Sequence, residues 1–404
     1  MLMMKKRSLA LIVIFFMLVS AAGTAAVILL GGLSAGGLVM VPKTEYEDYR
    51  AIKKEYATMF DLKEYINKNY YLPVENEALN EGIYKGLFMG IGDPYSSYLS
   101  KEEYEDIMMS TSGEFQGIGV TIAPDDNGFI SVIAPIEDTP AERAGIKAGD
   151  KIVKVDDTEY SSVTINEAVS AMRGEAGTKV VIAVLRNGRI ISFDIIRSNI
   201  ILKSVKSEML ENNIGYIRIT NFDEKTGEEF GTHLRSIELK KPAGIIIDLR
   251  DNPGGVVDAS VEVADRLLGA GVITYTEDRA GKKEYYKSDA DKLDIPYVVL
   301  INKGSASASE ILAGAVKDFE AAKIVGETSF GKGIIQRITP YGDDGGGIKL
   351  TVMQYFSPKG SVIHKQGVEP DVQVEILEED YVDGTLPEEN DKQMLKAIEL
   401  LLNE

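Results

Sequence analysis

The sequence contains no cysteine and only two histidines, His233 and His364, among its 404 residues. The absence of cysteine excludes disulfide bonds, cysteine nucleophiles and cysteine-bound zinc. No HExxH motif is present, and a histidine-dependent catalytic triad has only two candidates for its base. Basic residues are also scarce, since 44 Lys and Arg stand against 63 Asp and Glu, which gives a net charge of −19. This acidity argues against nucleic acid as a partner, because phosphate groups bind to cationic surfaces.

Disorder is excluded by composition. Hydrophobic residues make up 44% of the chain and charged residues 26%, which is enough apolar surface to build a core. At roughly 150 residues per domain, the length predicts two to three domains.

Charged side chains are missing from residues 8–41, directly after a basic cluster at residues 5–7. Residues 9–30 alone exceed the roughly 20 apolar residues that span a bilayer. We therefore expect an N-terminal membrane anchor within residues 1–41, with residues 1–7 in the cytoplasm and the rest outside. The alternative is a cleaved signal peptide, for which alanines at 22, 25 and 26 offer a cleavage site. Both interpretations place the body of the protein outside the cytoplasm.

Residues 42–102 are predicted to form an N-terminal helical region. Apolar residues recur at helical spacing without Gly or Pro over residues 44–66, and residues 76–90 resemble a second helix. The apolar stripe of the first helix, which is rich in tyrosine, needs a partner. It either packs on the protein's own body or forms a dimer contact.

Residues 103–199 are predicted to form a small, partly open β-barrel with two helices. Short Gly-bounded strands alternate with two helical segments, and Asn187-Gly188 is a strong signal for a tight hairpin. The segment Gly117-Ile118-Gly119-Val120 offers consecutive backbone N–H groups. Such a loop can hold the C-terminal carboxylate of a peptide that adds as a strand.

Residues 200–380 alternate strands with helices, which predicts an α/β core. The strands within residues 243–250 and 295–302 are almost continuously apolar, as expected for strands buried on both faces. Residues 366–391 hold ten acidic and no basic residues, which is typical of a solvated or linking segment. An amphipathic helix closes the chain within residues 381–404 and is a second candidate dimer element.

Residues 304–310, Gly-Ser-Ala-Ser-Ala-Ser-Glu, join the second buried strand to a helix. Unpaired N–H groups and the positive end of the dipole lie at a helix N-terminus. A serine there can be a nucleophile, and the next amide can help to bind an oxyanion. The alternative is that the serines only cap the helix.

A serine hydroxyl needs a base to become a nucleophile. Lys332 stands between two glycines in an otherwise uncharged stretch. Burial lowers the pKa of a lysine, and a neutral amine can deprotonate serine. The alternative is a surface or phosphate-binding lysine, although GxxxxGK[ST] is absent. The turn at residues 251–255, Asp-Asn-Pro-Gly-Gly, follows the first buried strand, where α/β folds bind ligands. It is either the second oxyanion donor or an ordinary turn.

The motifs GSASASEI, DLRDNPGG and TSFGKGIIQ, after a GIGV…AGIKAGD unit, resemble those of the C-terminal processing peptidases, also called tail-specific proteases. The resemblance covers roughly residues 60–376 and implies a PDZ domain inserted before an α/β serine-protease core. It also implies substrates with free protein C-termini, no metal or nucleotide, and a homodimer in the anchored members. The residue roles that it implies are nucleophile Ser307, base Lys332, orienting Gln336, oxyanion donors Ala308 and either Gly254 or Gly255, and gating residue Arg173.

Three functions compete at this point. The first is an anchored, extracytoplasmic serine endopeptidase that binds C-terminal tails through its PDZ domain and cleaves them with a Ser–Lys dyad. The second is a PDZ scaffold whose protease-like body only binds peptides, although a scaffold has no reason to keep Ser307, Lys332 and Gln336. The third is a trypsin-like PDZ protease, which the absence of a GDSGG-like turn disfavours.

Overall fold

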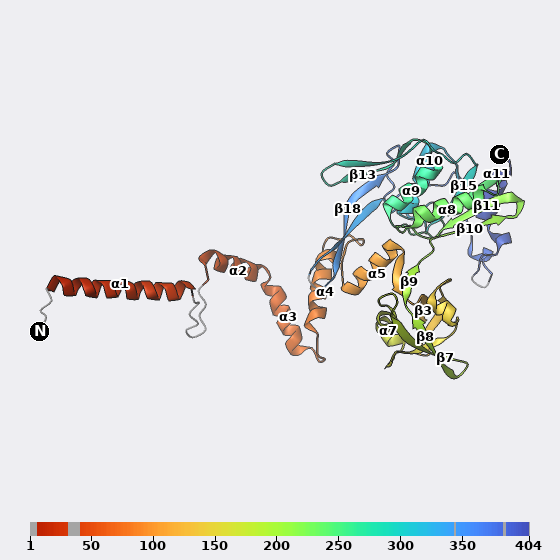
Figure 1. Cartoon of the computed structure of the whole chain (residues 1–404). Helices are drawn as coiled ribbons and strands as arrows, with labels where there is room; N and C mark the ends of the chain where they lie inside the picture. Colours follow the sequence, from red (N-terminus) through yellow and green to blue (C-terminus); the bar gives the residue numbers. More distant parts are fainter. Residues whose placement is uncertain (1–5, 31–40, 343–344, 383–384, 404) are drawn as a thin grey trace. The chain divides into compact units, whose positions relative to one another are not determined.

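The computed structural model describes residues 6–30, 41–342, 345–382 and 385–403, and the chain divides after Ile83 into two units (Figure 1). The first unit contains helices α1 (Lys6–Leu30), α2 (Lys43–Glu55) and α3 (Ala57–Asn69). Helix α4 (Asn76–Met89) begins in this unit, as predicted. The prediction of one helix over residues 44–66 is wrong. The backbone of Tyr56 leaves the helical region (φ −101°, ψ 13°), and this separates α2 from α3.

The transmembrane anchor predicted over residues 9–30 is not supported. Among the described residues, no helix is both long enough and apolar enough to cross a bilayer. Residues 1–5 and 31–40, which were included in the predicted anchor region, lie outside the described residues.

The second unit contains the predicted barrel with its two helices. Its sheet has the strand order β3-β4-β5-β7-β8, and a separate ribbon pairs β2 with β9. The bounds are β2 (Glu114–Gly117), β3 (Val120–Pro124), β4 (Ile130–Pro135), β5 (Lys151–Val155), β7 (Lys179–Arg186), β8 (Arg189–Ile196), β9 (Ser198–Ile201), α6 (Pro140–Ala144) and α7 (Ile165–Met172). The predicted hairpin joins β7 to β8, with Asn187 and Gly188 both at positive φ. Its core is apolar and includes Ile130, Ile152 and Ile182.

The α/β core is built on a sheet with the order β10-β11-β12-β15-β16-β19, in which β11 to β19 run parallel. The strands are β10 (Val205–Leu210), β11 (Ile214–Ile219), β12 (Gly244–Asp248), β15 (Tyr297–Ile301), β16 (Lys323–Gly326) and β19 (Val372–Gln373). Strands β12 and β15 are buried along their whole length, as their apolar sequences predict.

Helices cover both faces of this sheet. Ile245 and Ile247 face one side, together with α8 (Thr226–Glu238), α9 (Val257–Leu267) and α10 (Ala308–Phe319). Ile246 faces the other side, where α11 (Lys392–Asn403) buries Leu401. Successive strand residues point to opposite faces, so a strand between two helix layers is apolar throughout. The amphipathic stripe of α11 is thereby used within its own chain.

A second sheet completes the protease core and carries part of the site. Its strand order is β1-β18-β13-β14, and β17 also pairs with β18. The strands are β1 (Ser97–Leu99), β13 (Gly271–Asp278), β14 (Lys283–Ser288), β17 (Ile334–Pro340) and β18 (Gly347–Phe356). Strand β1 is followed directly by helix α5 (Lys101–Ser112). Strand β1, which follows α4, thus pairs with β18, although the two strands are far apart in sequence.

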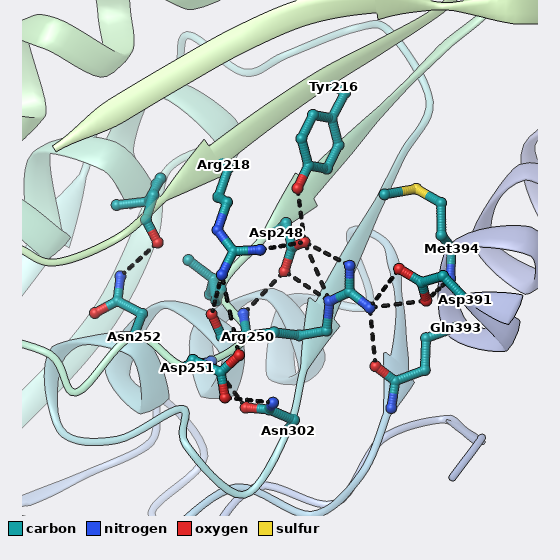
Figure 2. Close-up of polar contacts among 12 residues, drawn as sticks. Tyr216, Arg218, Asp248, Arg250, Asp251, Asn252, Asn302, Asp391, Gln393 and Met394 are labelled. Atoms are coloured by element: carbon teal, nitrogen blue, oxygen red, sulfur yellow. Dashed lines mark hydrogen bonds and ion pairs between the residues drawn. The ribbon is translucent and has the colours of Figure 1, made fainter. Parts of the chain in front are cut away.

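A buried polar network attaches α11 to the end of β12 (Figure 2). The Arg250 guanidinium pairs with Asp248 at 2.7 Å and with Asp391 at 2.9 Å. Gln393 accepts a further hydrogen bond from Arg250. The prediction that residues 366–391 are merely solvated or linking is therefore wrong for Asp391. Asp380 is also buried, and its carboxylate pairs with Lys392. Acidic residues in this segment hold the closing helix in place.

Candidate active site

The nucleophile turn uses its three serines in different ways. Ser305 and Ser309 are fully buried, and their hydroxyls donate to the carbonyl oxygens of Leu249 and Asn252. Both therefore attach the turn to the end of β12. Ser307 is half-buried, and its hydroxyl donates no hydrogen bond within the described residues. Of the three serines, Ser307 is thus free to react.

The backbone of Ser307 is strained. Its φ of 54° and ψ of −113° lie in a region that residues other than glycine avoid. Helix α10 begins at the next residue, so Ser307 is the N-cap of this helix, and its own backbone is not helical. Strain of this kind persists only where surrounding contacts impose it and is concentrated at functional sites.

Lys332 lines the same cleft as Ser307, together with Gly254, Gly255 and Gln336. The cleft has a volume of about 630 Å³. Burial lowers the pKa of the Lys332 amine, and repulsion from Lys349 lowers it further, whereas Glu310 and Asp93 act in the opposite direction. The predicted base is therefore half-buried, in a setting that favours its neutral form.

Glu310 joins the backbones of Ser307 and Lys332. Its carboxylate is fully buried and accepts hydrogen bonds from the N–H groups of Ser307 and Lys332, each at 2.8 Å. It also accepts from Gly331 N–H and from the Ser329 hydroxyl. Four donors satisfy this buried carboxylate, and no cationic side chain pairs with it in the part of the chain that the structure describes. Sequence reasoning missed this residue, which it included only as part of a helix start.

Tyr355 of β18 makes the matching contact on the acceptor side. Its hydroxyl lies 3.0 Å from the Ser307 carbonyl oxygen and 2.8 Å from the Lys332 carbonyl oxygen. Burial, followed by the nearby charge of Glu310, raises the pKa of this phenol well above its usual value, so it remains a donor. The two turns are thus held together through their N–H groups by Glu310 and through their carbonyl groups by Tyr355.

The turn after β12 packs directly against the serine. A side chain at Gly254, which has φ +95°, would place its Cβ 2.7 Å from Ser307 Cβ. The Gly254 N–H is already occupied, because it donates to Asn252 Oδ1 at 2.9 Å. The N–H groups of Gly255 and Ala308 have no acceptor among the described residues. Of the two glycines that the sequence left open, Gly255 therefore has the available donor.

Gln336 lies on β17 and lines the cleft beside Lys332. Its side-chain amide donates to the Thr351 hydroxyl at 3.3 Å. Thr351 in turn hydrogen-bonds to the carboxylate of Asp93. Burial raises the pKa of Asp93, but the hydrogen bonds from the Ser96 and Thr351 side chains outweigh this effect and lower the pKa. The loop that contains Asp93 is a part of the site that sequence reasoning did not identify.

The peptide-binding loop predicted in the PDZ-like barrel has the expected backbone. Gly119 has φ +78°, and the N–H groups of Ile118 and Gly119 have no acceptor in the part of the chain that is described. Gly117 ends β2 and Val120 begins β3, so the loop joins two strands. These N–H groups remain available for an anionic ligand.

Arg173 connects this loop to the cleft. Gly117 and Arg173 lie close together, because a Cβ atom added at Gly117 would lie 3.8 Å from the Arg173 Cα. The Arg173 guanidinium donates to Asp106 at 3.0 Å and approaches the Met109 sulfur at 3.5 Å, both on α5. Met108 and Thr111 of the same helix line the cleft. The predicted gating residue thus contacts the helix that borders Ser307.

Comparisons with known proteins agree with this architecture. The PDZ domain model matches residues 116–196, and that of peptidase family S41 matches residues 213–374. The carboxy-terminal-processing protease of Bartonella bacilliformis is 38% identical over 353 residues, which cover 85% of this chain and 80% of that protein. The carboxy-terminal processing protease CtpA of Bacillus subtilis is 39% identical over 316 residues, which cover 78% of this chain and 67% of that protein.

Among solved structures, a photosystem II D1 C-terminal processing protease is 29% identical, covers 82% of this chain and 92% of that chain, and has a TM-score of 0.47. The α/β core and the PDZ domain define a serine-type peptidase that carries its own peptide-recognition module. The chain belongs to peptidase family S41 and, within it, to the carboxy-terminal processing proteases. The resemblance inferred from the motifs is confirmed, and so is the combination of a PDZ domain with an α/β protease core.

Proposed function

We propose that this protease cleaves protein tails with a Ser307–Lys332 dyad. The observation that carries the proposal is the shared frame: Ser307, with a free hydroxyl on a strained backbone, and half-buried Lys332 are joined at both their N–H and carbonyl groups by Glu310 and Tyr355. Neutral lysine is a base of the strength that serine activation requires.

The chemistry follows from these positions. The Lys332 amine takes the hydroxyl proton as Ser307 Oγ bonds to the scissile carbonyl carbon. The N–H groups of Ala308 and Gly255 hold the oxyanion that forms. As the carbon–nitrogen bond breaks, the leaving amine takes the proton from Lys332 and an acyl ester remains on Ser307. Water then gives a proton to Lys332 and attacks the ester, and the proton returns to Ser307 Oγ on release.

The test compares the wild type with Ser307→Ala and Lys332→Ala on a protein with an apolar, unstructured C-terminal tail. We expect each variant to lose at least about 10³-fold in kcat/KM. Exposed Ser361→Ala and Lys282→Ala are the matched controls and should retain activity. Full activity in either dyad variant would refute the dyad.

The activity should also depend on pH in a definite direction. Burial disfavours the cationic form of Lys332, so the base is neutral at a lower pH than an exposed lysine would be. We expect kcat/KM to fall as the pH falls through the pKa of Lys332 and to rise to a plateau above it. A profile that stays level from acid to alkaline pH contradicts a lysine base.

We further propose that the PDZ loop at Ile118 and Gly119 recognises the free carboxylate of the tail and that Arg173 relays its occupancy to α5. The available N–H groups and the contact between Arg173 and Asp106 support this. Peptides with a free C-terminus should bind to the Ser307→Ala protein, and their amidated counterparts should bind at least about tenfold more weakly. Equal affinity of the two peptides would remove the carboxylate from the mechanism.

Two proposals concern the whole protein. We propose export of the catalytic part from the cytoplasm, on the basis of the basic cluster followed by the uncharged residues 8–41. Cell fractionation tests this proposal, and a cytoplasmic catalytic domain would refute it.

We also propose a homodimer through α2 and α3, where Tyr49, Ile52 and Phe60 are each at least 50% exposed. Sedimentation equilibrium of the wild type and of Tyr49→Ser/Phe60→Ser tests it, and a monomeric wild type would refute it.

A further inference from the structure

The loop that precedes β1 brings an aromatic ring to the proposed base. The Tyr95 ring centroid lies 5.1 Å from Lys332 Nζ. This distance is within the range in which a ring face attracts a cation, about 6 Å from the centroid. Tyr95 is half-buried and precedes Ser96, whose side chain is buried. The contact is with the nitrogen itself and not only with the methylene chain.

The loop is held firmly enough to define the position of the ring. Asp93 accepts a hydrogen bond from Tyr95 N–H at 3.0 Å and one from the Ser96 hydroxyl at 2.6 Å. The same Ser96 oxygen accepts from Thr351 N–H of β18 at 2.9 Å. Because β18 also carries Tyr355, the loop and the Ser307–Lys332 frame are fixed to one strand.

Three charged side chains act on Lys332 from the elements packed around it. Lys349 on β18 repels the ammonium, whereas Glu310 on α10 and Asp93 in the loop attract it. The carboxylate of Glu310 is occupied by Ser329 and three backbone N–H groups. Asp93 is likewise occupied by Tyr95 N–H and by the hydroxyls of Ser96 and Thr351. Within the described residues neither carboxylate bonds to Nζ, whereas the Tyr95 ring faces the nitrogen directly.

We propose that Tyr95 is a positioning residue for Lys332: its ring holds Nζ in the cleft beside Ser307 and keeps water from it. This inference rests on the proposed dyad. The ring has two effects that substitutions can separate. Its electron-rich face favours the ammonium, and its bulk excludes water. Phenylalanine keeps both effects, leucine keeps only the bulk, and alanine keeps neither.

The experiment measures kcat/KM against pH for the wild type and for Tyr95→Phe, Tyr95→Leu and Tyr95→Ala. We expect Tyr95→Phe to keep the wild-type midpoint. Tyr95→Leu should move the midpoint to lower pH. Below the wild-type midpoint, the activity of this variant as a fraction of its own plateau should then be about 3- to 10-fold higher than the same fraction for the wild type. Tyr95→Ala should move the midpoint to higher pH, because water then stabilises the ammonium. Both should lower the plateau.

Tyr285→Leu, on the exposed side of β14, is the matched control and should leave the profile unchanged. Profiles of Tyr95→Leu and Tyr95→Ala that superimpose on that of the wild type after scaling would overturn the proposal. So would a Tyr95→Phe profile that shifts as the leucine variant does, since the hydroxyl and not the ring would then be responsible.

A direct titration separates this inference from the dyad itself. In Ser307→Ala protein with labelled lysine, the Lys332 resonance is identified by its loss in Lys332→Arg, and its pKa is measured without turnover. A Lys332 pKa that falls with Tyr95→Leu and rises with Tyr95→Ala supports the positioning role even if Lys332→Ala proves active and the dyad fails. An unchanged pKa in both variants refutes the role of Tyr95 and leaves the dyad intact. Melting temperatures identify a variant that has lost its fold.

Discussion

At the scale of single residues, the strain at Ser307 has a measurable cost. A residue other than glycine held at φ 54° and ψ −113° costs on the order of 1–3 kcal/mol. Glycine adopts positive φ without this cost, whereas alanine does not. We therefore expect Ser307→Gly to be more stable than Ser307→Ala by about 1 kcal/mol, measured as the free energy of unfolding in urea. Both lack the nucleophile, so a difference reflects the backbone. Equal stabilities would show that the strain is absent in solution.

Tyr355 offers a second prediction at this scale. Tyr355→Phe removes the donor shared by the Ser307 and Lys332 carbonyl oxygens. We expect a loss of about 1–2 kcal/mol in unfolding free energy. We also expect kcat to fall about tenfold or more with little change in KM, because the two turns are no longer held together. The control is Tyr216→Phe, which loses a hydrogen bond to Asp248 outside the cleft. A fall in kcat of equal size in the control would assign the effect to general stability.

The residues that sequence reasoning found and those that it missed differ in kind. Ser307 and Lys332 stand in short turns with unusual composition, at the ends of apolar segments, and such positions are visible in a single sequence. Glu310, Tyr355 and Tyr95 lie in ordinary helix, strand and loop sequence. Their roles come from long-range contacts, such as that between Tyr95 and Lys332, and no local pattern encodes these.

At the scale of elements, the Arg250 network predicts how firmly α11 is attached (Figure 2). Asp391→Ala removes one partner of a buried guanidinium and also the acceptor for Met394 N–H at the start of α11. We expect a loss of about 2–4 kcal/mol in unfolding free energy. Lys396→Ala breaks only an exposed ion pair on the same helix and should cost less than about 0.5 kcal/mol. Losses of equal size in urea titrations would contradict the network.

The elements that could be predicted are those with one clear pattern. Strand β15, and β12 up to its last residue Asp248, are apolar because both faces are buried, and α9 shows plain helical spacing. The sheet containing β13, β17 and β18 was not predicted, because its residues are half-buried and mixed in polarity. In the acidic segment before α11, only Asp380 and Asp391 were misread, because charge usually indicates solvent exposure, and here Lys392 and Arg250 compensate these two buried carboxylates.

At the scale of the whole molecule, partly exposed ion pairs join the PDZ domain to the segments on either side of it. Arg173 pairs with Asp106 of α5, and Glu137 pairs with Lys203, which follows β9. Exposed pairs of this kind contribute about 0–1 kcal/mol each and weaken with salt. A contact of this strength can be broken and remade by ligand binding, because a peptide needs only a small difference in affinity to shift the equilibrium.

The corresponding prediction concerns regulation and not stability. We expect Arg173→Ala to change the unfolding free energy by less than about 0.5 kcal/mol. It should, however, change the ratio of turnover between a protein with a free tail and a short peptide blocked at its C-terminus. Lys179→Ala removes an exposed pair within the PDZ domain and should leave that ratio unchanged. An unaltered ratio in Arg173→Ala would separate this contact from tail sensing.

Glu310 and Tyr355 hydrogen-bond only to main-chain atoms of residues 307 and 332. Either reactive side chain can therefore be deleted while the surrounding scaffold keeps its shape. An inactive variant made in this way should still bind protein tails in the position in which the wild type cleaves them. Such a variant is therefore suitable for the affinity isolation of natural substrates from cells.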